Sequence, residues 1–183
     1  GLIFGAAIGG QIDTEAMGFY EAYIHPWFNL FSVSVGVFTV AICGFLASVF
    51  LVAEARKTEV KREVVRKAKL FIVFTVLAGG VVFAASLVDD VPLVWLLFKE
   101  WITIGMLVLA TFAMVLLWVK MEEGSKIFVR ILCGFVVTAI LSAFGYHYFP
   151  DLIITKSGEN LSVFNSAAIG KPIEKLGWAL LIG

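Results

Sequence analysis

The sequence is short of charged residues, and this shortage excludes an ordinary soluble domain. Only 15% of the 183 residues are charged and 61% are hydrophobic, whereas soluble domains average about 25% charged residues. The apolar excess lies in long blocks, which indicates a membrane protein rather than a large soluble core. Basic and acidic residues balance at 14 each, so no net charge favours a nucleic-acid partner.

Cysteine and histidine are also scarce. Cys43 and Cys133 both lie inside apolar runs, so we expect free, buried thiols rather than a disulfide. His25 and His147 are the two histidines, and neither has further ligands at metal-site spacing. We find no phosphate loop, zinc motif or nucleophile motif in the sequence. We therefore predict no catalytic, cofactor-binding or metal-binding residue in this chain.

Four apolar runs are long enough to cross a bilayer, which needs about 20 residues. They cover residues 27–53, 70–88, 101–119 and 131–149. Their length and the absence of period-2 alternation predict helices, which satisfy their own backbone in lipid. Residues 1–10 and 174–183 read as partial helices of a chain truncated at both ends. The expected fold is all-α, a single polytopic transmembrane bundle over residues 1–183.

The basic residues predict the orientation of this bundle. Segments 54–69 and 120–130 hold 10 of the 14 Lys and Arg residues, so the positive-inside rule places both in the cytoplasm. Segments 11–26, 89–100 and 150–173 then face outward, in strict alternation. The basic segment 54–69 has two readings. It is either a solvated end of a helix or a specific site for lipid headgroups.

The four apolar runs contain no Asp, Glu, Lys or Arg. Ionisable groups inside a membrane usually mark ion paths and proton relays, so a pump built from these runs would lack its usual carriers. Small residues recur four positions apart, which favours close helix packing. These pairs are Ser32/Gly36, Gly44/Ser48, Gly80/Ala84 and Ala139/Ala143.

The last loop and the start of the first run carry a resemblance to a known family. "YFPDLI" (148–153) and "LSVFNSAAIGKPIEKLGWALLIG" (161–183) follow one another in the order and spacing seen in subunit II of cytochrome bd-type quinol oxidases. "PWFNLFSVSVG" (26–36) resembles the start of an earlier helix of that subunit, although Phe28 precedes Asn29 here. Leu161, Phe164, Asn165 and Ala167 lie near the family's loop positions. Asn165 or Ser166 is also a candidate helix cap.

The resemblance implies a role in the cytoplasmic membrane of a prokaryote. Such complexes oxidise quinol and reduce dioxygen to water in the respiratory chain. The resemblance places haems b and d in a partner, subunit I, and makes this chain a non-haem structural subunit that supports its assembly. Membrane lipids and quinol are the other expected partners. On this reading the chain runs from the end of the fourth helix of the subunit to the start of the ninth.

Two other functions stay open from the sequence. A haem-binding membrane cytochrome could use His25 and His147, which both lie on the predicted outer side. The alternative for each histidine is an interfacial residue bonded to water, headgroups or a neighbouring loop. A multi-pass transporter or channel would need its charges outside this fragment.

Overall fold

The computed structural model describes residues 1–55, 58–122, 125–158 and 160–166. Within these ranges the apolar runs form four long helices, each long and apolar enough to cross a membrane. They are α3 (Leu30–Glu54), α4 (Thr58–Val88), α6 (Trp101–Lys120) and α7 (Lys126–Tyr148). The predicted all-α transmembrane bundle is confirmed.

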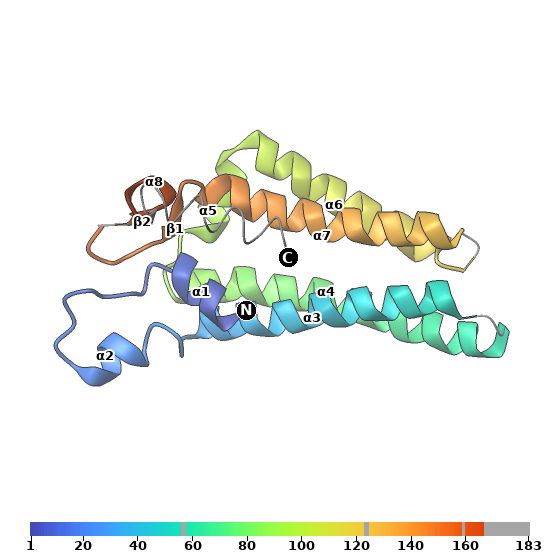
Figure 1. Ribbon diagram of the computed structural model, residues 1–183, viewed down its shortest axis with the longest axis horizontal. Coiled ribbons are helices and arrows are strands. Elements are labelled where there is room, and N and C mark those ends of the chain that lie inside the picture. Colours follow the sequence, from blue (N-terminus) through green and yellow to red (C-terminus); the bar gives the residue numbers. More distant parts are fainter. Residues whose placement is uncertain (56–57, 123–124, 159, 167–183) are drawn as a thin grey trace, which may run out of the picture.

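The long helices form two antiparallel hairpins that lie side by side (Figure 1). One hairpin consists of α3 and α4, the other of α6 and α7, and α3 packs against α7 between them. The chain reverses after Glu54 and after Lys120 at the same end of the bundle. We call this the basic end, because the two basic segments 54–69 and 120–130 lie there.

The opposite end, which we call the loop end, holds most of the short elements (Figure 1). Helix α1 packs along α3, and a two-stranded antiparallel sheet follows α7. The connection at 89–100 contains a short helix. The short elements are α1 (Leu2–Ile8), α2 (Phe19–Tyr23), α5 (Leu93–Lys99), β1 (Asp151–Ile153), β2 (Leu161–Ser162) and α8 (Val163–Ser166).

Two helices begin at places that hydropathy alone does not mark. Helix α3 starts at Leu30 rather than at Trp27, because the Asn29 side chain accepts a hydrogen bond from the Ser32 N–H at 2.7 Å and caps the helix. Helix α4 starts at Thr58, well before the apolar run at residue 70. The basic segment therefore continues the membrane helix past its apolar part.

The buried core has two centres. Near the basic end, Phe45, Ile72, Leu117 and Cys133 join all four long helices. Toward the loop end, a second cluster is built around Phe31 and Leu97 and adds α1 and α5 to the packing. Cys133 is free and buried as expected, but Cys43 is free and exposed, because it lies on a face of α3 turned away from this core.

Glycine allows two helices to approach closely at some, but not all, of the small-residue positions that the sequence predicted. A Cβ on Gly5 would lie 2.8 Å from the Ser32 Cα, so α1 can sit on α3 only with glycine there. A Cβ on Gly44 would lie 2.4 Å from the Phe71 ring, which packs α4 against α3. Gly80, by contrast, has no atom within 4 Å of such a Cβ. The Gly80/Ala84 pair therefore does not mark a tight contact.

Candidate functional site

A groove at mid-membrane depth separates the two core clusters. It has a volume of about 350 Å³ and is lined mainly by α4 and α6. Phe38 of α3 and two residues of α7, Ile140 and Phe144, complete the lining. On α4 the lining runs from Thr75 to Phe83, and on α6 from Leu107 to Met114. The groove is thus the place where the two hairpins do not fill the space between them.

The polar atoms of this groove are satisfied internally. The Thr75 hydroxyl lies 2.8 Å from the Phe71 carbonyl and 3.2 Å from the Ala41 carbonyl. The Thr111 hydroxyl donates to the Leu107 carbonyl at 2.8 Å. A threonine hydroxyl has a single proton to donate, and here the backbone takes it. The groove consequently offers hydrocarbon contact rather than acid–base or metal chemistry.

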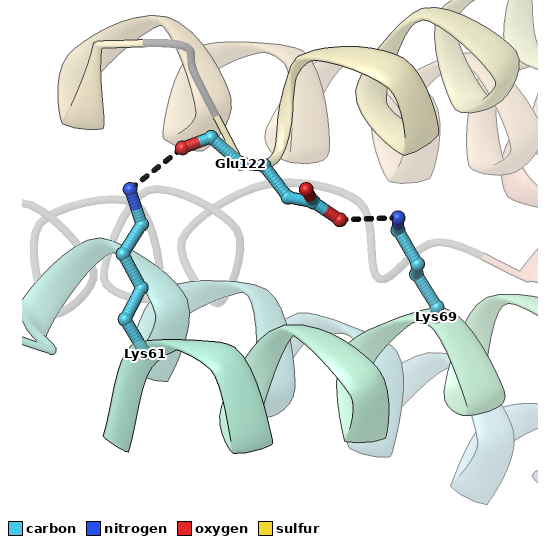
Figure 2. Close-up of polar contacts among 3 residues, drawn as sticks. All are labelled: Lys61, Lys69 and Glu122. Atoms are coloured by element: carbon cyan, nitrogen blue, oxygen red, sulfur yellow. Dashed lines mark hydrogen bonds and ion pairs between the residues drawn. The ribbon is translucent and has the colours of Figure 1, made fainter. Parts of the chain in front are cut away.

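At the basic end, a second and larger hollow of about 860 Å³ lies between α4 and the turn after α6. Lys69 Nζ lies 2.6 Å from Glu122 Oε1, and Lys61 Nζ donates to the Glu122 carbonyl at 2.7 Å. Figure 2 shows both lysines reaching from one helix to Glu122 on the other hairpin. This clamp joins the hairpins through side chains.

Electrostatics favour this clamp. The hydrogen bond and the positive charge of Lys69 lower the pKa of the Glu122 carboxyl, with smaller contributions from Arg62 and Lys61. A second pair, between Arg130 of α7 and Glu54 of α3, links the hairpins on the same end. The Arg130 guanidinium also lies 5.6 Å from the centre of the Phe50 ring.

At the loop end, backbone hydrogen bonds replace ion pairs. The Ile154 N–H donates to the Ala7 carbonyl and the Lys156 N–H donates to the Ile12 carbonyl, both at 2.9 Å. Asn160 closes the loop from inside: its amide donates to Asp151 Oδ2 at 3.0 Å, and its oxygen accepts from the Thr155 N–H at 3.2 Å. The long loop is therefore tied to the N-terminal part of the chain.

Asp89 ties the first hairpin to the same end. Its Oδ2 accepts a hydrogen bond from the Phe31 N–H at 2.6 Å, at the start of α3. Its carbonyl accepts from the Gln11 side chain at 3.1 Å. A carboxylate at a helix N-terminus satisfies a free N–H and complements the helix dipole. The sequence does not reveal this role, because Asp89 and Phe31 are 58 positions apart in the chain.

A comparison with protein families shows which family the chain belongs to. The family described as cytochrome bd terminal oxidase subunit II matches residues 1–183. The chain belongs to this family. A search of curated proteins finds no match for the chain. Membership implies a complex with a subunit I, and it confirms the resemblance drawn from the loop and the first run.

Among the described residues that carried the resemblance, Phe149, Pro150 and Phe164 lie close together at the loop end. Phe149 follows α7, and its ring meets the ring of Phe164 edge to face, with centroids 5.9 Å apart. The Val163 N–H donates to the Pro150 carbonyl at 2.9 Å. Asn165 and Ser166 end α8, and the helix that either residue was expected to cap lies outside the described residues, as do their side chains, Ala167 and residues 174–183, so the cap stays a prediction.

The two histidines have separate surroundings. His25 precedes α3, and its ring lies 6.4 Å from that of Tyr20. His147 lies in the last turn of α7, with its ring 5.4 Å from that of Tyr148, and lines a shallow hollow with Glu100. Within the described residues no three His, Cys, Asp or Glu side chains gather as a metal site would require. The absence of catalytic residues stays a prediction.

Proposed function

We propose that this chain is a non-haem structural subunit of a bd-type terminal quinol oxidase and supports the assembly of its haem-bearing subunit I. The observation that carries the proposal is the match of the subunit II family to residues 1–183. The complex would oxidise quinol, reduce dioxygen to water and serve the respiratory chain. Haems b and d belong to the partner on this proposal.

The membrane interior of the chain fits a scaffold. The four apolar runs carry no Asp, Glu, Lys or Arg, and the mid-membrane groove offers no free proton-carrying group among its described residues. Large side chains such as Phe112 and Val108 are exposed on the long helices. Such faces require lipid or another subunit to cover them.

We place the chain in the cytoplasmic membrane of a prokaryote. The basic end, with segments 54–69 and 120–130, lies in the cytoplasm, and the loop end, with segments 11–26, 89–100 and 150–173, lies outside. The gathering of both basic segments at one end of the bundle supports this orientation (Figure 1).

The scaffold role is tested by omitting the subunit. Cells that produce subunit I without the full-length form of this chain should show a strong loss of spectrally intact oxidase in their membranes, because subunit I lacks its packing partner. Immunoblots of subunit I measure synthesis separately from assembly. An undiminished oxidase spectrum without this subunit would refute the proposal.

The non-haem part of the proposal needs a different readout. The full-length subunit, produced without subunit I, should give a flat reduced-minus-oxidised difference spectrum. Haem bound at one or more equivalents per chain would contradict a scaffold that holds no cofactor.

A further inference from the structure

We infer that one anionic phospholipid lies between the two hairpins, with its phosphate against Arg62, Arg66 and Lys69 and one acyl chain in the mid-membrane groove beside Gly80. The inference rests on the proposed function only for orientation, which places the headgroup in the cytoplasmic leaflet. Three observations carry it: the free cations at the basic end, the continuous faces of α4 and α6, and the satisfied polar atoms of the groove.

The basic hollow holds cations whose donors are available. Arg62 and Arg66 are exposed, and neither forms a hydrogen bond or ion pair with any described residue. Each guanidinium presents five N–H donors in a planar fork that matches phosphate oxygens. Lys69 borders the same hollow with its side chain only 27% exposed.

The acidic residues around the hollow leave its phosphate face basic. Glu63 is paired with Lys67 at 2.9 Å, and Glu122 is held by Lys61 and Lys69. Glu59 also lines the hollow, three residues before Arg62 on α4. Lysines and arginines still outnumber the carboxylates in its lining, and Glu63 takes its partner Lys67 from outside, so the hollow keeps a net positive charge where a bilayer places its phosphates.

One face of α4 connects this hollow to the groove. Arg62 and Gly80 are 18 residues apart, which is five full turns at 3.6 residues per turn, so they share a face. Arg66, Lys69, Val73 and Val76 lie along the same face at spacings of three and four. Val73 is 46% and Val76 57% exposed, so the path between the two sites is open and apolar.

Helix α6 provides the matching wall. Leu107, Thr111 and Met114 line the groove, and Trp118 continues this face toward the basic end. Lys69 Nζ lies 5.4 Å from the centre of the Trp118 ring. Tryptophan beside a cation at the end of a membrane helix is typical of the level of lipid headgroups.

The dimensions suit one acyl chain. From Lys69 to Gly80 the helix rises about 16 Å at 1.5 Å per residue. Half of the roughly 30 Å hydrocarbon core is about 15 Å. A chain that begins at the phosphate level therefore ends in the groove, whose polar atoms are already bonded to backbone and whose walls are apolar.

The test uses the complete oxidase in vesicles of equal parts phosphatidylglycerol and phosphatidylcholine. The complex is extracted in mild detergent, and retained lipid is counted by native mass spectrometry. We expect the wild-type complex to retain one phosphatidylglycerol, and R62Q/R66Q to lose it. The affinity of the complex for this lipid should fall about tenfold or more, because two guanidinium groups that bind the phosphate are lost. K120Q/K126Q is the matched control, since it removes two charges of the same end that lie outside the hollow and form no ion pair with a described residue, and it should retain the lipid.

Two further variants separate lipid binding from folding and from headgroup binding alone. R62K/R66K keeps the charge but loses the bidentate geometry, so an intact complex should bind the lipid more weakly than wild type. G80L adds a side chain to the groove where no atom lies within 4 Å, and it should displace the lipid. Excess inorganic phosphate should leave the lipid bound, because phosphate lacks the acyl chain.

Each contrary result would overturn the inference. Equal retention in R62Q/R66Q and K120Q/K126Q would mean that the hollow holds no phosphate. Unchanged retention in G80L would place the acyl chain outside the groove, and displacement by inorganic phosphate would reduce the site to an anion patch. Haem content of the same preparations reports assembly with subunit I, so a failure of the proposed function appears as lost haem rather than as lost lipid.

Discussion

The two ends of the bundle are held together by different kinds of interaction. At the basic end, long charged side chains bridge the hairpins, with Lys61 and Lys69 on Glu122 and Arg130 on Glu54. At the loop end, backbone groups of residues 154 and 156 pair with α1 and the segment after it, and Asp89 holds the start of α3. One end is fixed by charge and the other by backbone geometry.

This difference teaches where each end can tolerate change. Exposed ion pairs contribute little each and weaken with salt. Hydrogen bonds to partly buried backbone groups cost more when one partner is removed, because the other is left unsatisfied. The loop end should therefore be the more sensitive to single substitutions, and the basic end the more sensitive to ionic strength.

The largest effect is expected when a charged side chain, of the kind that only the ends of the bundle carry, is introduced inside the membrane. Gly44→Asp should destabilise the subunit by several kcal/mol, since insertion scales give about 2.5–3.5 kcal/mol for a charge at a helix centre. The Phe71 ring, 2.4 Å from the new Cβ, adds a clash. Yield of assembled, haem-containing oxidase measures the effect.

Gly105→Ala is the control for this substitution, because a Cβ at Gly105 meets no atom within 4 Å. It should assemble as wild type does. Unimpaired assembly of Gly44→Asp would mean that water reaches this position. The middle of α3 would then tolerate charge as the basic end does.

A smaller effect is expected at the loop end itself. Asp89→Ala leaves the Phe31 N–H without its acceptor at the start of α3, which should cost about 1–2 kcal/mol. The thermal inactivation midpoint of the solubilised oxidase reports this loss. Asp90→Asn is the matched change, since Asp90 has a φ of 53°, a conformation that asparagine also adopts. Equal inactivation midpoints for the two variants would mean that the Asp89 carboxylate does not stabilise the start of α3.

The smallest effect is expected at the basic end. Glu122→Gln should lower the inactivation midpoint only slightly, and the difference from wild type should vanish in high salt because the Glu122 side chain is 61% exposed. A difference that persists in high salt would show that the clamp acts through packing rather than charge.

The clamp also has a pH dependence with a defined sign. Lys69 lowers the pKa of Glu122 below its ordinary value of 4.5 in the folded protein. The stabilisation is therefore complete above 4.5 and disappears as the pH falls through the lower folded pKa. Midpoints of wild type and Glu122→Gln should differ at neutral pH and converge in acid. A constant difference across this range would contradict the ion pair.

The sequence predicted the long helices because hydropathy and helix length are local properties. Hydropathy did not mark the start of α4 at Thr58, but the reading of segment 54–69 as a solvated end of a helix agrees with it. Helix α5 inside a connection was not predicted. The pairing of Ile154 with Ala7 depends on residues distant in the chain. The residue spacings that predict helices and strands apply only to neighbouring residues and do not predict such a distant pair.

The candidate sites divide in the same way. The basic segment 54–69 was visible as a possible headgroup site, but its register with the groove needs the path of α4 beside α6. Gly44 and Gly80 belong to the same small-residue pattern, yet one touches Phe71 and the other faces open space. Which small residue packs is decided by the neighbouring helix, and a single helix pattern does not contain that information.

The central claim is that this chain supports a haem-bearing partner without ligating haem. The most direct test is the reduced-minus-oxidised spectrum of the assembled oxidase with His25→Ala and His147→Ala combined. We predict that every haem band keeps its position and its intensity per complex, because the two rings pack against Tyr20 and Tyr148 in separate surroundings. Loss or shift of one haem band in a complex that still contains both subunits would contradict the claim.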